Sequence, residues 1–173
     1  WLANSMIANE CFNCSDPNVG LSLNEDRTYV KCYMGDTGLL ISHTFDENEI
    51  VDNELYRELL FGKLSTNEGM FYENVIAQML VANGHKLYFY THYNTEKHRN
   101  DIEIDFVLSN NSKLKYKIYP VEVKSNNRYT INSLIRFNEK YKERIGGCYV
   151  IHPKNLIIKD GILCIPPYMT MML

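Results

Sequence analysis

The chain has 173 residues, of which 45% are hydrophobic, and its formal net charge is −3. This length and composition fit one domain of ordinary size and argue against an intrinsically disordered chain. No apolar run reaches the roughly 18 residues that a membrane-spanning helix needs, and no signal peptide is visible, so we expect a cytoplasmic protein without a membrane partner.

The N-terminal part of the chain is acidic and is predicted to form short elements. Residues 1–60 contain three Lys or Arg against eleven Asp or Glu. A strand is expected at Thr28 to Met34, and Asp36 is placed to cap a short helix after it. The acidic stretch 46–58 is a candidate surface for a protein partner. We therefore expect an N-terminal segment, residues 1–62, of short strands and helices.

Five cysteines without a secretion signal indicate a reducing compartment, since disulfide frameworks usually use an even number. Cys11 and Cys14 have the C-x-x-C spacing of zinc and redox sites. A tetrahedral zinc site needs two further ligands, and the sequence offers neither a second C-x-x-C nor a nearby His pair. We interpret Cys11 and Cys14 as two cysteines beside a turn, with zinc or redox chemistry as the alternative.

The clearest helix is expected from Thr66 to Ala82. Residues 65–68 read Ser-Thr-Asn-Glu, which is a capping-box pattern, and Asn83-Gly84 is a typical end signal. At about 100° per residue, the apolar side chains of this helix make one continuous arc. Asn74 and Gln78 fall on a different face, which we expect to be solvated.

Glu73 lies inside the apolar arc of this helix. A carboxylate on a buried stripe is costly unless it is paired or bound to a metal ion. Glu73 is therefore a candidate metal ligand. The alternative is that Glu73 lies at the edge of the arc or pairs with a buried basic group.

The second half of the chain has the pattern of an α/β fold. Polar and apolar residues alternate from Asp101 to Leu108, as expected for a strand. Asp160-Gly161 separates two short apolar runs, which is typical of a hairpin. The other expected elements are strands at 86–93, 118–125 and 148–152 and a helix at 130–144. The core order is then helix, three strands, helix and strand, followed by the hairpin.

Two of these strands bring charged residues together. Folding the chain about the polar tip at 110–117 sets Asp105 opposite Glu122 and Glu103 opposite Lys124. On the other face the same register pairs apolar residues: Ile104 with Val123, Phe106 with Val121, and Leu108 with Tyr119. Two carboxylates about 5 Å apart repel each other unless a cation lies between them, and a hard divalent ion suits oxygen ligands. The alternative is a solvated face with a plain Glu103–Lys124 ion pair.

Four motifs occur in order along the chain. They cover residues 33–40, 71–77, 103–107 and 121–125, and they begin Tyr-Met-Gly-Asp, Phe-Tyr-Glu-Asn, Glu-Ile-Asp-Phe and Val-Glu-Val-Lys. Over residues 6–168 the chain resembles the uncharacterised C-terminal domain that follows an AAA-type ATPase module in many bacterial and archaeal proteins. A site of Glu73, Asp105, Glu122 and Lys124 is similar to that of the PD-(D/E)xK nuclease superfamily, although Ile104 stands where its motif has proline.

The resemblance implies an α/β fold with a restriction-endonuclease-like core in residues 63–173. Such a core has a mixed central sheet flanked by helices in the order α-β-β-β-α-β, and here a C-terminal β-hairpin follows it. The resemblance also implies an ATPase module before Trp1. ATP would bind only there, because this chain has no G-x-x-x-x-G-K-[ST] loop. We therefore expect the chain to be a piece of a longer protein.

The resemblance further implies a role for each site residue. Mg²⁺ or Mn²⁺ would have its oxygen ligands at four positions: Glu73, Asp105, Glu122 and the carbonyl of Val123. Lys124 would orient the attacking water and stabilise the developing charge. Ser125 and Arg128 would contact phosphate.

Two functions follow as hypotheses. The first is a metal-dependent nuclease module that hydrolyses DNA phosphodiester bonds, and the complete set of four catalytic residues favours it. The second is a non-catalytic module that binds DNA or a protein partner, and the net acidity favours it. Residues 113–144, with nine Lys or Arg against three Asp or Glu, suit a phosphate backbone or else form a solvated helix face and loop.

Overall fold

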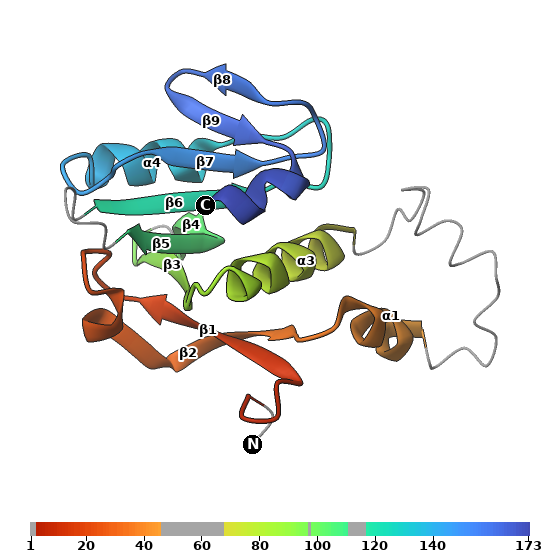
Figure 1. Cartoon of the computed structure of the whole chain (residues 1–173). Helices are drawn as coiled ribbons and strands as arrows, with labels where there is room; N and C mark the ends of the chain where they lie inside the picture. The colour runs from red at the N-terminus through yellow and green to blue at the C-terminus, as the bar shows by residue number, and fades with distance from the viewer. Residues whose placement is uncertain (1–2, 46–67, 97, 111–116) are drawn as a thin grey trace.

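Two mixed β-sheets form the framework of the protein (Figure 1). The structure is a computed structural model that describes residues 3–45, 68–96, 98–110 and 117–173. The strand order is β2-β1-β3-β4 in the first sheet and β5-β6-β7-β9-β8 in the second. The expected mixed α/β fold is confirmed, but two sheets replace the single central sheet that the sequence predicted.

The first sheet joins N-terminal strands to strands from the middle of the chain. Its members are β1 (Ala8–Cys14), β2 (Glu25–Met34), β3 (Leu87–Asn94) and β4 (Arg99–Ile104). The strand β1 is antiparallel to β2, to which the 3-10 helix η1 (Leu21–Asn24) connects it, and parallel to β3. The strands β3 and β4 are antiparallel. The boundary expected between residues 62 and 63 lies outside the described residues.

The second sheet contains the predicted C-terminal hairpin. Its members are β5 (Phe106–Asn110), β6 (Lys117–Val123), β7 (Cys148–Ile151), β8 (Ile157–Lys159) and β9 (Ile162–Ile165). Antiparallel β8 and β9 are joined by Asp160 and Gly161, whose φ angles are 53° and 77°. Two positive φ values match the turn that an Asp-Gly pair favours, so the hairpin is confirmed. The 3-10 helix η2 (Pro167–Met172) follows it.

The chain passes from the first sheet to the second at Asp105. The sequence predicted one strand from Asp101 to Leu108, and this is wrong, because β4 ends at Ile104 and pairs it with Tyr90 of β3 rather than with Val123. The predicted register holds for the rest of the hairpin, in the pairs Phe106–Val121 and Leu108–Tyr119. Polar and apolar residues continue to alternate through Asp105. This alternation indicates which side chains are buried, but it does not indicate which strand lies beside them.

The described helices are α1 (Thr37–Phe45), α3 (Glu68–Ala82) and α4 (Asn132–Lys140). Asp36 caps α1 as predicted, because its Oδ1 accepts the N–H of Gly38 at 2.7 Å. The end of α3 is also as predicted. Gly84 has a φ of 87°, and the N–H groups of Gly84 and His85 bond carbonyls of the last helical turn. The expected cap residues 65–67 lie outside the described residues.

The helix α4 is shorter than the predicted span 130–144. It ends at Lys140, and Tyr141 has a non-helical ψ of 24°. The N–H of Arg144 bonds the carbonyl of Tyr141 at 2.8 Å, so a turn replaces the last part of the expected helix. Gly146 then brings the backbone close to Tyr119, whose ring lies 2.6 Å from where a Cβ at residue 146 would be.

The strand β6 is covered on both faces, and this fixes the position of the site. Leu80 of α3 and Val121 belong to one buried apolar cluster, and Phe137 of α4 and Ile118 belong to the other. Successive side chains of a strand point to opposite faces, so the two clusters lie on opposite sides of β6. The end of β6 therefore lies between two packed helices.

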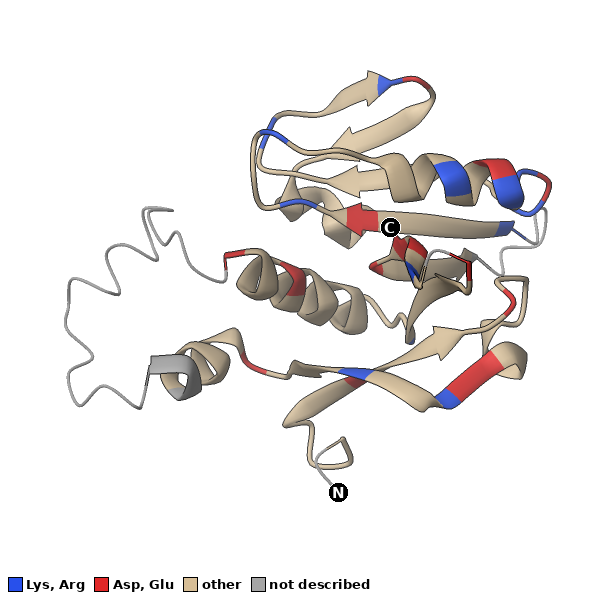
Figure 2. Ribbon diagram, turned by 180° about the vertical axis from the view of Figure 1, so that it is seen from behind, with Lys and Arg blue, Asp and Glu red and all other residues tan. Residues whose placement is uncertain are grey.

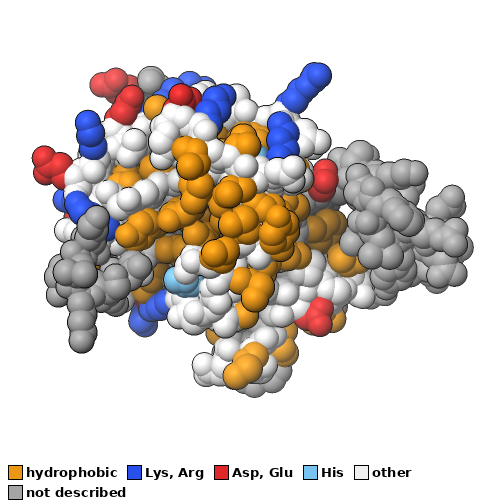
Figure 3. Space-filling view, turned by 45° about the horizontal axis from the view of Figure 1, so that its top comes forward, with side chains coloured by type: hydrophobic (Ala, Val, Ile, Leu, Met, Phe, Trp, Pro, Cys, Tyr) orange, Lys and Arg blue, Asp and Glu red, His pale blue; other side chains and the backbone are white. Residues whose placement is uncertain are grey.

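Exposed apolar residues are frequent in the segment after β7. Figure 3 shows apolar side chains gathered across the middle of one face of the molecule. The exposed large apolar residues of this segment are Leu156, Ile157, Ile158, Tyr168, Met171 and Met172. Contiguous apolar surface of this kind marks interaction sites in many proteins. In the described part of the chain, no helix has the length and apolarity needed to cross a membrane.

Candidate active site

One open cavity of about 220 Å³ gathers most of the predicted site residues. Six of them line it: Glu73, Asp105, Val123, Lys124, Ser125 and Arg128. Glu122 does not line the cavity, but it precedes Val123 on β6. The cavity lies where α3, the passage between the two sheets and the end of β6 meet.

Asp105 occupies the junction between β4 and β5. Its Oδ2 accepts the backbone N–H of Val123 at 2.7 Å, so the side chain contacts the end of β6 without being part of the ladder. Burial, followed by the charge of Glu73, raises the pKa of Asp105 to about 7, against the opposing effects of the Val123 N–H and Lys31. The direct opposition of Asp105 and Glu122 predicted from the register is replaced by this side chain to backbone contact.

Glu73 is held by two residues of β2. Its Oε1 accepts hydrogen bonds from the Lys31 ammonium at 3.3 Å and from the Tyr33 hydroxyl. The Glu73 side chain is 25% exposed, so it faces the cavity without pointing into bulk solvent. The pairing with a basic group, which the sequence left open as an alternative, is observed.

Lys31 is a site residue that the sequence analysis missed. Its ammonium lies 3.3 Å from Glu73 Oε1 and 3.8 Å from Glu103 Oε1, and 5.2 Å from the ring centroid of Phe89. Burial lowers the pKa of Lys31, but the charges of Glu73, Asp105 and Glu103 raise it more, so the net shift is upward. No local signal identifies this lysine, because Glu73 is 42 residues away along the chain.

Glu122 and Lys124 form a second pair at the end of β6. The Lys124 ammonium donates to Glu122 Oε1 at 3.1 Å, and the Glu122 side chain is only 7% exposed. Burial raises the pKa of Glu122, and the charge of Lys124 opposes this shift. Among the described residues, the buried Oε2 of Glu122 has no hydrogen-bond partner. A buried carboxylate oxygen without a hydrogen bond lowers the stability of the fold. Such an unpaired oxygen is expected where a ligand binds.

The predicted pairing of Glu103 with Lys124 is wrong. Glu103 lies on β4, where it faces Thr91 of β3, and its carboxylate is near Lys31. Lys124 pairs instead with Glu122. The reason is the passage between sheets at Asp105, which separates Glu103 from the strand that carries Lys124.

Asn74 links α3 to the segment that ends β2. The sequence placed Asn74 on a solvated face, and this is wrong, because the residue is only 2% exposed. Its amide accepts the N–H of Met34 at 2.8 Å and donates to the Met34 carbonyl at 3.2 Å and to Thr37 at 3.0 Å. Gln78 makes a parallel pair of bonds to the same carbonyl and hydroxyl. These contacts hold β2, and with it Lys31, against the helix.

Tyr129 forms a wall of the cavity and is anchored by a buried histidine. The Nε2 of His152 lies 3.2 Å from the carbonyl of Asn155, which can only accept, so Nε2 carries the proton. The Nδ1 of His152 therefore accepts from the Tyr129 hydroxyl at 2.7 Å. Arg128 precedes Tyr129 and is exposed at the rim.

The two signs of charge are distributed unevenly over the fold. In Figure 2, blue positions are frequent in the half of the molecule that holds β6 to β9 and α4, whereas α3 carries only red ones and β2 carries both colours. The cavity takes its carboxylates Glu73 and Asp105 from one side and its cations Lys124 and Arg128 from the other. A ligand that combines a metal ion with a phosphate would meet complementary charge on both sides.

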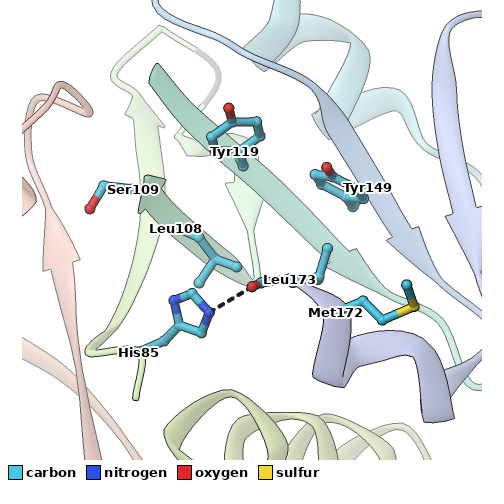
Figure 4. Close-up of a pocket in the computed structure, with 7 residues that line it drawn as sticks. All are labelled: His85, Leu108, Ser109, Tyr119, Tyr149, Met172 and Leu173. Carbon is cyan, nitrogen blue, oxygen red and sulfur yellow. Dashed lines mark hydrogen bonds between the residues drawn. The ribbon is translucent and has the colours of Figure 1, made fainter. Parts of the chain in front are cut away.

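A second cavity, of about 260 Å³, lies apart from the predicted site (Figure 4). It is bounded by His85, Leu108, Ser109, Tyr119, Tyr149, Met172 and Leu173. His85 Nε2 is bonded to the carbonyl of Leu173 at 3.1 Å. None of the described residues that line it is acidic, lysine or arginine. This cavity therefore lacks the charged groups that bind a metal ion or a phosphate.

Cys11 and Cys14 lie on β1 and both are buried. Burial raises the pKa of Cys11, and it raises the pKa of Cys14 to about 11, so neither is an activated thiol. All five cysteines are free in the described structure. Within the described ranges, no group of three or more His, Cys, Asp or Glu side chains is arranged to hold a metal ion.

Comparison with known proteins places the chain in a family. Residues 68–168, the segment that holds α3, the passage at Asp105 and β6, match the family described as a domain of unknown function, DUF4143. A search of the curated proteins finds no match. A search of the solved structures finds none either. The chain therefore belongs to the DUF4143 family, which is commonly found as the C-terminal part of AAA-ATPase proteins.

Proposed function

We propose that this chain is a metal-dependent, nuclease-like module that hydrolyses DNA phosphodiester bonds in the C-terminal part of an AAA-type ATPase. The observation that carries the proposal is the composition of one cavity. Carboxylates from α3 and from the passage between the sheets share it with Lys124 and Arg128. Acidic groups for a cation beside basic groups for a phosphate are the arrangement that phosphodiester hydrolysis needs.

The order of elements around the cavity supports the PD-(D/E)xK assignment. The segment from α3 to β7 runs helix, strands β3 to β6, helix and strand. We propose that β4 and β5 together represent the second strand of the restriction-endonuclease-like core, divided at Asp105. This division places the carboxylate at a strand end, where it is free to turn toward the end of β6.

The carboxylates of the site have the oxygen atoms that a divalent cation prefers, although no three of the described acidic side chains already surround one position. Glu122 has a buried oxygen without a partner in the described structure, and burial and the charge of Glu73 raise the pKa of Asp105. Mg²⁺ or Mn²⁺ prefers oxygen ligands. Such an ion would stabilise the unpaired oxygen of Glu122 and the ionised form of Asp105. The residues that would hold it are Glu73, Asp105, Glu122 and the carbonyl of Val123. When bound, the ion supplies Lewis-acid activation of the scissile phosphate.

The basic residues of the cavity have a separate task. Lys124 is held by Glu122 at 3.1 Å, which limits the motion of its long side chain. An oriented ammonium stabilises negative charge that develops on a phosphate oxygen during cleavage. Ser125 and Arg128 lie beyond it on the cavity rim and would contact a neighbouring phosphate.

The first test is a calorimetric titration of Mn²⁺ into the 173-residue chain beside its Glu122→Gln variant. We expect saturable binding by the wild-type protein and at least a tenfold weaker affinity in the variant, because a charged ligand is lost. Glu139→Gln is the matched control, since Glu139 is an exposed acid of α4. Cleavage of linear DNA should follow metal addition and be lost in Lys124→Ala. A folded protein that binds no Mn²⁺ contradicts the proposal.

The alternative is a non-catalytic module that binds a protein partner. One observation favours it, namely the exposed apolar surface of the segment after β7: Leu156, Ile157, Ile158, Tyr168, Met171 and Met172. The acidic residues 46–58, also predicted as a partner surface, lie outside the described residues. Failure of Mn²⁺ binding together with stable binding to an ATPase module would support this alternative.

A further inference from the structure

One lysine stands among the carboxylates of the candidate site. The Lys31 ammonium is 3.3 Å from Glu73 Oε1 and 3.8 Å from Glu103 Oε1, and its side chain is 28% exposed. These contacts come from three elements, since Lys31 lies on β2, Glu73 on α3 and Glu103 on β4. Lys31 therefore holds a positive charge in the region where the proposed cation would be.

The ammonium neutralises only part of the negative charge around it. Asp105 lies near enough for its charge to act on Lys31, yet its hydrogen bond is to the Val123 N–H. A single charge shared among Glu73, Asp105 and Glu103 leaves a net negative cluster. A divalent cation would neutralise such a cluster more completely than an ammonium does.

Lys31 has a second anchor that allows it to leave Glu73. Glu103 is half-exposed, with 51% of its side chain accessible, and the Lys31 ammonium also lies 5.2 Å from the ring centroid of Phe89. If the ammonium moves away from Glu73, it stays near Glu103. Glu73 keeps the hydrogen bond from Tyr33, so its carboxylate remains directed toward the cavity.

We propose that Lys31 is a built-in counter-ion, which holds the place of a divalent cation beside Glu73 until that cation displaces it. This inference rests on the proposed function, because the displacing ion is the one proposed for the active site. The consequence is that Lys31 sets the metal affinity of the site. It keeps the acidic cluster stable without metal, and it makes metal binding a competition between two cations.

Mn²⁺ titration of Lys31→Met tests this competition. We expect Lys31→Met to bind Mn²⁺ about tenfold more tightly than the wild-type protein, because no ammonium has to be displaced. Lys31→Arg should bind with wild-type affinity, since it keeps the charge. Lys159→Met is the control for the loss of one positive charge, because Lys159 lies exposed on β8.

The outcomes separate this inference from the proposed function. Tighter Mn²⁺ binding by Lys31→Met than by a wild-type protein that also binds Mn²⁺ supports the inference. Equal or weaker binding by Lys31→Met, with a wild-type protein that binds, overturns the inference and leaves the proposed function standing. Absence of binding in both proteins overturns both.

A second measurement uses only the wild-type protein and so does not depend on the folding of a variant. Acetylation of lysines by acetic anhydride is followed by mass spectrometry with and without saturating Mn²⁺. We expect the metal to raise the labelling of Lys31 severalfold, because its ammonium is released from Glu73. Lys159 should label equally in both conditions. Unchanged or lower labelling of Lys31 in a protein that binds Mn²⁺ overturns the inference.

Discussion

The two sides of the candidate site differ in how many hydrogen bonds their polar side chains make within the protein. On the side of α3 and β2, Glu73 accepts two hydrogen bonds and Asn74 makes three. On the side of β6, Glu122 has a buried oxygen that accepts no hydrogen bond from any described residue. The loop after β6 adds Ser125 and Arg128 at the rim of an open cavity.

The first side therefore has mainly a structural role, whereas the second side has polar groups that remain available to bind a ligand. Hydrogen bonds between α3 and β2 join residues about 40 positions apart, so they hold the tertiary structure as well as the site. Glu122 and Arg128 lie at the end of one strand and in the loop after it, and the fold needs less from them. Substitution of Asn74 on the first side should therefore lower stability, and substitutions on the second side should change ligand binding.

The largest effect is expected for Asn74→Ala. This change removes three hydrogen bonds and leaves the N–H of Met34, at a partly buried position, without its side-chain partner. We expect the free energy of unfolding to fall by about 3 kcal/mol, because unsatisfied buried backbone groups are costly. Urea unfolding followed by circular dichroism measures the change. Asn126→Ala, an exposed residue of the cavity rim, should change stability by less than about 0.5 kcal/mol. Equal losses in the two variants would remove the distinction between the sides.

Asn74 also shows that a sequence pattern does not reveal contacts between residues far apart in the chain. The end of α3 was predictable because Gly84 and its hydrogen bonds are local, and the β8–β9 hairpin was predictable because Asp160-Gly161 sets its turn. The burial of Asn74 depends on Met34, which is 40 residues away. Helical periodicity assigns a polar residue to the wet face, and only the tertiary partner reverses that assignment.

The next effect concerns the pH dependence of stability and the junction residue Asp105. Burial and Glu73 raise the pKa of Asp105 from 3.8 to about 7. Its ionised form is therefore disfavoured in the folded protein, and the resulting loss of stability is complete above pH 7 and absent below about pH 4. We expect Asp105→Asn to be more stable than wild type at pH 8 in EDTA, by roughly 2 kcal/mol because the carboxyl is only half-buried.

The sign of this effect has a control on the neighbouring strand. Hydrogen bonds from His92 and Asn94 lower the pKa of Asp101, so its ionised form is favoured by folding. Asp101→Asn should therefore lose stability at pH 8, opposite to Asp105→Asn. Urea unfolding at pH 8 and pH 4.5 measures both. If Asp105→Asn is less stable than wild type at both pH 8 and pH 4.5, the Asp105 carboxylate does not destabilise the folded protein. The argument that its charge calls for a bound cation then fails.

Asp105 marks the limit of the register argument as well. The pairs from Phe106 onward were predictable, because both strands alternate and the tip fixes their register. The sequence did not show that Ile104 leaves this ladder for β3, because alternation is the same for one long strand and for two strands in different sheets. The residues of the cavity were thus identified by type and order, while their contacts, above all those of Lys31, required the tertiary structure.

The smallest effect is expected for Arg128→Ala, which tests the rim on the binding side. Arg128 is exposed, and among the described contacts none ties it to the fold, so stability should stay within about 0.5 kcal/mol of wild type. If its guanidinium contacts a DNA phosphate, the affinity for a fluorescent duplex should fall by about threefold to tenfold for any base sequence. The slope of log affinity against log salt should also fall by about one, because one fewer counterion is released. Fluorescence anisotropy across a salt series measures both quantities, with Lys159→Ala on the distant β8 as the control. An unchanged slope would mean that the DNA phosphates bind elsewhere. The rim of the cavity would then have no role in binding, and the distinction between the two sides of the site would fail.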